Sequence, residues 1–87
     1  MKTKYSIEFS KKYVKDLEKI PKIYRENITE KVAALSSDPR PDGCKKLRGQ
    51  MPLYRLRCGD YRIVYAINDN VLLILVLEVG HRREIYR

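Results

Sequence analysis

The sequence has few of the residues that bind metals, build disulfide scaffolds or cross membranes. Its 87 residues include no Trp, one Phe, one His and two Cys. Cys44 and Cys58 fit no zinc-binding spacing and are too few for a disulfide scaffold, which is typical of a reduced, cytoplasmic protein. The longest apolar run, 71–77, is seven residues long, whereas a membrane-spanning helix needs about 20. We therefore expect no metal, no cofactor and no membrane span.

Positive charge, by contrast, is abundant and unevenly distributed. Lys plus Arg is 19 and Asp plus Glu is 11, which gives a net charge of +8 and favours a polyanionic partner. Residues 1–43 contain eight Lys and two Arg, whereas residues 44–87 contain two Lys and seven Arg. Arginine binds phosphate through two hydrogen bonds and stacks on bases. The first half therefore predicts a solvated scaffold. The second half predicts a phosphate-binding surface, unless Arg is there only because it suits strand surfaces.

The N-terminal half predicts one strand followed by a helical hairpin. Residues 5–9 alternate apolar and polar side chains, as a strand does. Ser10 is a candidate N-cap, and Pro21 separates two stretches of apolar residues at helical spacing. Two prolines and a glycine then exclude regular structure from 36–43, so the hairpin covers 10–36. The two apolar stripes are Tyr13, Leu17 and Ile20, then Tyr24, Ile28, Val32 and Leu35.

The C-terminal half predicts a sheet. Residues 53–58 and 61–67 alternate around a Gly59-Asp60 turn. Residues 71–79 are apolar on both faces except at Glu78, which predicts an interior strand covered on both sides. The chain is therefore expected to form one domain, 1–87, of the α+β class. Its two layers are an N-terminal strand with a helical hairpin, packed on one face of a mainly antiparallel sheet.

This arrangement places a group of arginines on one face of the sheet. Arg55, Arg57 and Arg62 point away from the helices, and the hairpin makes Arg57 and Arg62 neighbours. Like charges in that position destabilise a sheet, and Asp60 alone cannot neutralise three guanidinium groups. We therefore expect this face to bind an anion. The residues expected under the helices are Tyr54, Leu56, Ile63 and Tyr65.

The C-terminal tail offers two further candidate groups. His81 is the one His of the chain and follows Gly80 at the end of the apolar strand. It is either a surface residue without a role or a proton-transfer group, because histidine is the side-chain type suited to proton transfer near neutral pH. Tyr86 is either a core residue or a stacking group for an RNA base.

The residues present match the requirements of RNA cleavage without a metal. A base must take the proton of the 2′-OH, cations must stabilise the phosphorane, and an acid must protonate the 5′ oxygen. Several guanidinium groups supply the cations, and one His supplies the base or the acid. A basic loop of Lys45, Lys46 and Arg48 is either a solvated charge run or a contact to backbone phosphate.

Three segments carry a family resemblance, namely 46–49 (KLRG), 53–65 (LYRLRCGDYRIVY) and 79–86 (VGHRREIY). Together they resemble the RelE/ParE toxin superfamily, on the RelE side, and the resemblance covers essentially the whole chain. It implies a toxin of a type II toxin–antitoxin pair that cleaves mRNA in the ribosomal A site, leaving a 2′,3′-cyclic phosphate and a 5′-OH.

The resemblance also implies roles for individual residues. The positions that match the family's working residues are Arg55, Arg57, Arg62, Arg82 and Tyr86. The best-known member has Lys at the first two positions, and Arg is a far weaker base than Lys. Either the arginines therefore act only through their charge and His81 carries a proton, or the reaction is slower; we include His81 in the candidate catalytic set. The expected RNA-binding residues outside the catalytic set are Lys45, Lys46, Arg48 and Arg83.

Two other functions stay open, and several partners are implied. The same fold could serve as a ParE-like inhibitor of DNA gyrase, or as an RNA-binding domain without activity. The arginine group favours the nuclease, because phosphate chemistry needs it. The implied partners are a cognate acidic antitoxin, mRNA and the ribosome, with a toxin–antitoxin hetero-oligomer on operator DNA.

Overall fold

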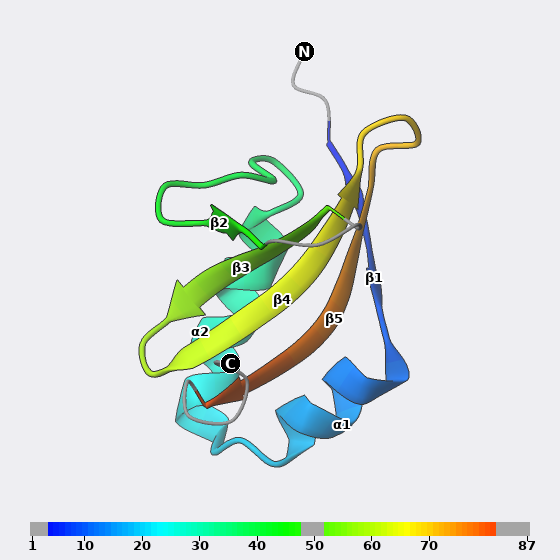
Figure 1. Cartoon of the computed structure of the whole chain (residues 1–87). Helices are drawn as coiled ribbons and strands as arrows, with labels where there is room; N and C mark the ends of the chain where they lie inside the picture. The colour runs from blue at the N-terminus through cyan, green and yellow to red at the C-terminus, as the bar shows by residue number, and fades with distance from the viewer. Residues whose placement is uncertain (1–3, 48–51, 82–87) are drawn as a thin grey trace.

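Two helices pack against a five-stranded sheet, which confirms the predicted α+β class (Figure 1). The structure is a computed structural model and describes residues 4–47 and 52–81. The elements in chain order are β1 (Ser6–Phe9), α1 (Lys11–Glu18), α2 (Lys22–Ala34), β2 (Lys45–Lys46), β3 (Leu53–Cys58), β4 (Tyr61–Asn68) and β5 (Leu73–His81).

The strands lie in the order β1-β5-β4-β3-β2. β3, β4 and β5 form an antiparallel meander, and β1 pairs with β5 in parallel. The apolar strand is interior, as predicted, but it begins at Leu73 and continues through Gly80 to His81. Its second face is only half-buried at Leu75 and Leu77, so the expectation of full cover on both sides was wrong.

β2 is the element that the sequence pattern did not reveal. Lys45 pairs with Arg55 and Lys46 with Tyr54, where a loop was expected. A strand of two residues is too short to show alternation. Tertiary pairing therefore decides its conformation.

The core lies between the helices and one face of the sheet. The four sheet residues predicted there are buried, with at most 8% of their surface exposed. Tyr24 departs from its predicted helical stripe, because 48% of its surface is exposed and its ring contacts Tyr61 at a centroid distance of 5.6 Å. The buried core residues on the helices and the turn between them are Tyr13, Ile20, Ile28 and Val32, with Leu35 directly after α2.

Ser10 fixes the start of α1 and joins it to β5. Its hydroxyl accepts a hydrogen bond from the Tyr13 N–H at 3.0 Å, which confirms the predicted N-cap. The same hydroxyl donates to the Leu77 carbonyl at 2.6 Å. The Val79 N–H donates to the Asp16 carboxylate at 3.4 Å. α1 thus continues along the edge of β5 beyond the end of β1, and its side chains satisfy backbone groups that would otherwise lack partners.

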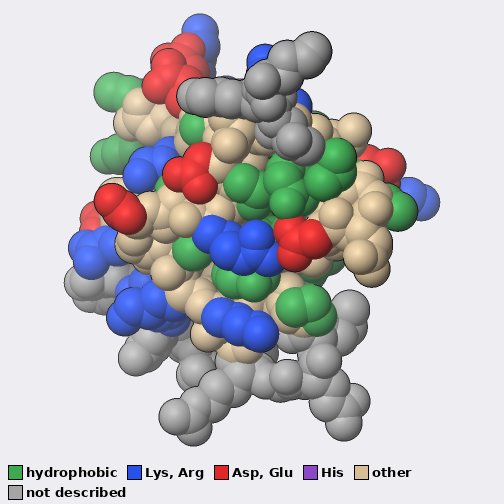
Figure 2. All heavy atoms as spheres, turned by 90° about the horizontal axis from the view of Figure 1, so that it is seen from above, with side chains coloured by type: hydrophobic (Ala, Val, Ile, Leu, Met, Phe, Trp, Pro, Cys, Tyr) green, Lys and Arg blue, Asp and Glu red, His purple; other side chains and the backbone are tan. Residues whose placement is uncertain are grey.

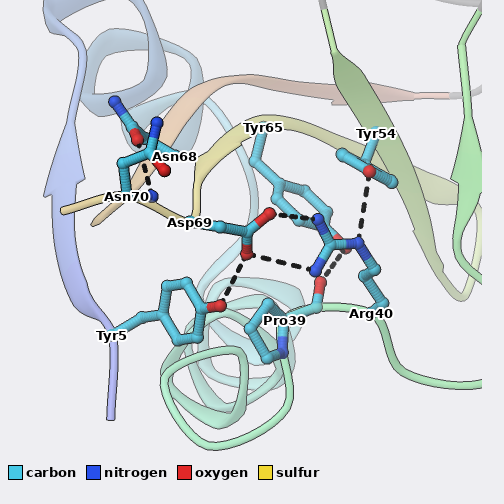
Figure 3. Close-up of polar contacts among 8 residues, drawn as sticks. All are labelled: Tyr5, Pro39, Arg40, Tyr54, Tyr65, Asn68, Asp69 and Asn70. Carbon is cyan, nitrogen blue, oxygen red and sulfur yellow. Dashed lines mark hydrogen bonds and ion pairs between the residues drawn. The ribbon is translucent and has the colours of Figure 1, made fainter. Parts of the chain in front are cut away.

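The long connection from α2 to β2 is tied down by Arg40 (Figure 3). Its guanidinium donates to the Asp69 carboxylate at 2.9 Å and to the Tyr54 hydroxyl at 3.2 Å. The Tyr5 hydroxyl donates to the same carboxylate at 2.6 Å. These four residues join the connection to β3, to the β4–β5 turn and to the segment that leads into β1.

Candidate nucleic-acid interface

Four basic residues share the sheet face that the helices leave uncovered. In the strand register, Lys45 lies opposite Arg55, and Arg57 lies opposite Arg62. Directly opposed residues point to the same face, and Tyr54 and the other core residues of β3 alternate with Arg55 and Arg57. We call Lys45, Arg55, Arg57 and Arg62 the arginine face. The predicted convergence of its three arginines is confirmed by this register.

The other register partners of this face carry no negative charge. Arg55 lies between Lys45 and Val64, and Arg62 lies between Arg57 and Gly80. Two opposed cations about 5 Å apart repel each other by roughly 0.8 kcal/mol in water, and by more where water is excluded. A phosphate bound on this face would reduce that repulsion.

Glu78, the acidic residue closest to the arginine face in the strand register, has a partner on a helix. Glu78 lies opposite Val64, and its carboxylate is 3.2 Å from the Lys12 ammonium group of α1. Lys12 also contacts Asp16 at 2.8 Å, and the hydrogen bonds to these acids raise the pKa of Lys12. α1 therefore supplies a cation that partly neutralises this carboxylate.

Arg57 is held at the tip of the β3–β4 hairpin. Its Nε donates to the Gly59 carbonyl at 3.0 Å, and Gly59 has a φ of 61°, which is favourable for glycine. The hydrogen bond keeps the guanidinium beside the turn. Arg57 consequently borders both the arginine face and a cavity at the end of the hairpin.

His81 lies on the other face of the sheet from Arg55 and Arg62. It is opposite Tyr61 in the register, and the two rings meet edge to face at a centroid distance of 5.8 Å. We expected β5 to bring His81 alongside the arginines. Of the three arginines, only Arg57 lines the same cavity as His81, because strand alternation turns the His81 ring toward α2 and away from the arginine face. His81 and Arg57 line one cavity of about 480 Å³.

Sequence reasoning missed other residues of this cavity. Tyr24 and Asn27 reach it from α2, and Asp60 and Tyr61 reach it from the β3–β4 hairpin. Tyr24 had been assigned to the core because it falls at helical spacing with Ile28. The sequence feature that could have indicated this position is that Tyr24 lies at the start of its helix. An apolar residue there can lie beyond the edge of the sheet.

The remaining predicted residues divide into two groups. Lys46 lies opposite Tyr54, so it belongs to the other side of β2 from Lys45, although it is exposed. The others lie outside the described residues and are Arg48, Arg82, Arg83 and Tyr86.

Cys58 fits a structural role. It is buried in the core with 9% of its surface exposed, and burial raises the pKa of its thiol, with a smaller opposing effect from Lys31. A raised pKa reduces the thiolate fraction that a nucleophile needs. This agrees with its interpretation as a small apolar residue.

The basic character does not extend evenly over the surface. Figure 2 shows the end of the molecule seen from above, where Lys and Arg side chains lie among acidic and hydrophobic ones.

Residues 4–47 and 52–81 contain no group of three or more His, Cys, Asp or Glu placed to hold a metal ion. No helix in this part of the chain is long and apolar enough to cross a membrane.

Comparisons with known proteins place the chain in a family. The sequence model described as ParE toxin of type II toxin–antitoxin system, parDE, matches residues 7–86. The chain is 31% identical over 86 residues to the mRNA interferase toxin RelE of Escherichia coli strain K12, covering 94% of this chain and 90% of that protein. It is 33% identical over 85 residues to toxin RelG of Mycobacterium tuberculosis, covering 95% and 97%.

Solved structures of RelE toxins have the same fold as this chain. The RelE–RelB complex of Pyrococcus horikoshii contains a chain that matches with a TM-score of 0.83 and 31% identity, covering 93% of this chain and 98% of that one. The isolated RelE toxin of Escherichia coli matches with a TM-score of 0.76 and 29% identity, covering 94% and 90%. The two-layer α+β fold of this chain is therefore also the fold of solved RelE toxins. The chain belongs to the RelE/ParE toxin superfamily of type II toxin–antitoxin systems.

Proposed function

We propose that this chain is the toxin of a type II pair and an endoribonuclease that cleaves mRNA in the ribosomal A site. The observation that carries the proposal is the arginine face, in which four cations share one side of three neighbouring strands. A surface of this kind suits the crowded negative charge of a phosphate in transition. The relative from Escherichia coli is named an mRNA interferase toxin, which supports the same activity.

The proposed reaction is an internal transesterification. The 2′ oxygen forms a bond to the scissile phosphorus as its proton passes to a base, and the bond to the 5′ oxygen breaks as that oxygen gains a proton. The products are a 2′,3′-cyclic phosphate and a 5′-OH. Arg55, Arg57 and Arg62 stabilise the pentavalent intermediate. His81 carries a proton, and Arg82 and Tyr86 complete the predicted catalytic set.

The proposed partner is an acidic antitoxin, and the place of action is the cytoplasm, where mRNA is translated. The solved relatives include toxin–antitoxin complexes from Pyrococcus horikoshii and Escherichia coli. Large apolar side chains exposed along β1 and the helices offer such a partner an apolar surface in addition to the basic one. They are Phe9, Val14 and Ile23, each at least 46% exposed. We extend the proposal to a hetero-oligomer of the pair on operator DNA.

Inhibition of DNA gyrase is the second candidate, because the matching family model carries the ParE name. Primer extension on cellular mRNA after induction, run beside a plasmid supercoiling assay, separates the two. We expect discrete cuts inside codons and unchanged supercoiling. Altered supercoiling without cuts would establish the gyrase reading instead. If neither cuts nor altered supercoiling are observed, the remaining interpretation is an RNA-binding domain without activity.

A further inference from the structure

The cavity at the end of the β3–β4 hairpin has a lining that the proposed cleavage does not use in full. It lies between the start of α2 and the hairpin and has a volume of about 480 Å³. Among the described residues that line it, only Arg57 and His81 belong to the predicted catalytic set. The residues without a role are Tyr24, Asn27, Asp60 and Tyr61.

Three aromatic rings line this cavity, and one of them contacts the other two. Tyr61 lies in the middle, with its centroid 5.6 Å from that of Tyr24 and 5.8 Å from that of His81. The Tyr24 ring is tilted by 43° to Tyr61 and is half-exposed, so it is not packed into the core. Aromatic faces left open in this way are the groups on which proteins stack unpaired bases.

The polar residues of the cavity can read the edge of a flat heterocycle. Asn27 offers an amide that both donates and accepts hydrogen bonds, and Asp60 offers a carboxylate that only accepts them. Both residues are exposed, so a ligand can reach them. A nucleobase presents the complementary pattern of donors and acceptors beside its π-face.

Arg57 connects the cavity to the arginine face. It lies opposite Arg62 in the sheet, lines the cavity, and is fixed by its hydrogen bond to the Gly59 carbonyl. A nucleotide whose phosphate contacts Arg57 can therefore direct its base either toward solvent or into the cavity.

We propose that the cavity binds one nucleobase of the RNA, adjacent to the phosphate held by the arginine face. The proposal rests on the proposed function, because that function supplies the RNA. Tyr24 stacks on the base, while Asn27 and Asp60 read its edge. Because a carboxylate accepts from an exocyclic amino group, and uracil has none, we expect uridine to bind most weakly.

The first test measures binding and needs no cleavage. Calorimetric titration of the purified full chain compares the four nucleoside 5′-monophosphates with ribose 5-phosphate. We expect adenosine monophosphate to bind at least about fivefold tighter than ribose 5-phosphate, which is the lower end of one base–aromatic stack. Tyr24→Leu should remove this difference. Thr29→Ala, on the same helix but outside the cavity, should leave it unchanged. Equal binding of the nucleotide and the sugar phosphate by the unaltered chain would overturn the proposal.

The second test uses Asn27→Ala, an exposed helix position whose replacement leaves the core intact. We expect this variant to bind the four nucleotides with a changed order of affinity, and to cut mRNA with a changed base preference at one position beside the cut. An unchanged order of affinity would overturn the base-reading role.

A chain that binds nucleotides as described but cuts no RNA would overturn the proposed function and leave this site standing. If the Asn27→Ala variant binds an acidic peptide partner more weakly but binds nucleotides with unaltered affinity, the cavity is instead a binding site for a protein.

Discussion

At the scale of single residues, the chemistry depends on how arginine differs from lysine. Arg55 and Arg57 stay protonated, so they hold a phosphate but accept no proton. Proton transfer then needs another group, and His81 is the one histidine among the described residues. His81 lies on the helix side of the sheet, yet it shares a cavity with Arg57 at the end of the hairpin.

This placement gives a direct comparison of His81 with Cys58, which also lines the cavity. We expect His81→Ala to lower the rate of mRNA cleavage by about 100-fold, because general acid–base catalysis contributes roughly 10² to 10⁴. Cys58→Ala should change that rate by less than about threefold, because its thiol has a raised pKa and serves the core. Single-turnover cleavage in a purified translation system measures both. Equal rates for the two variants, near that of the unaltered chain, would exclude His81 from proton transfer.

At the scale of elements, α1 and β5 depend on one hydroxyl group. Ser10 caps α1 through the Tyr13 N–H and also donates to the Leu77 carbonyl of β5. Loss of an N-cap costs about 1 kcal/mol, and loss of a second hydrogen bond adds a similar amount. We expect Ser10→Ala to lower the free energy of unfolding by about 2 kcal/mol in urea denaturation. Ser37→Ala, an exposed loop position, should cost less than about 0.5 kcal/mol. An equal cost for the two variants would contradict the linking role.

Element patterns were also the part of the fold that the sequence predicted well. The strand at 53–58, the helices on either side of Pro21 and the opposition of Arg57 to Arg62 follow from periodicity and a two-residue turn, which are local signals. The pairing of Lys45 with Arg55 is not local, because it depends on where a long connection returns. The cavity was missed for a similar reason, since Tyr24 and His81 meet only after the helix docks on the sheet.

At the scale of the whole molecule, Asp69 links parts of the chain that are distant in sequence. The hydrogen bonds from Arg40 and Tyr5 hold the pKa of Asp69 below its usual value of 3.8. A carboxyl whose pKa is lower in the folded state stabilises that state above its unfolded pKa. The contribution is lost as the pH falls through the folded value.

We therefore expect Asp69→Asn to unfold at a slightly lower urea concentration than the unaltered chain at about pH 7, since the group is exposed. The difference should shrink as the pH is lowered toward about 2, because Asp69 becomes protonated as the pH falls through its folded-state pKa. Asp38→Asn, exposed in the connection that carries Arg40, is the control and should have no such pH-dependent effect. A deficit of Asp69→Asn that is the same at both pH values would show that charge is not its cause.

The central claim is that the arginine face, and not the total charge of the molecule, stabilises the scissile phosphate. Its most direct test compares two triple variants that lose the same charge. One is Arg55→Gln, Arg57→Gln and Arg62→Gln, and the other is Lys11→Gln, Lys15→Gln and Lys22→Gln, at exposed positions on the two helices. The measurement is the single-turnover rate of mRNA cleavage on programmed ribosomes. We predict a loss of at least about 100-fold for the arginine variant and less than about threefold for the lysine variant. Equal losses in the two variants, or an arginine variant that cleaves at the normal rate, would contradict this account.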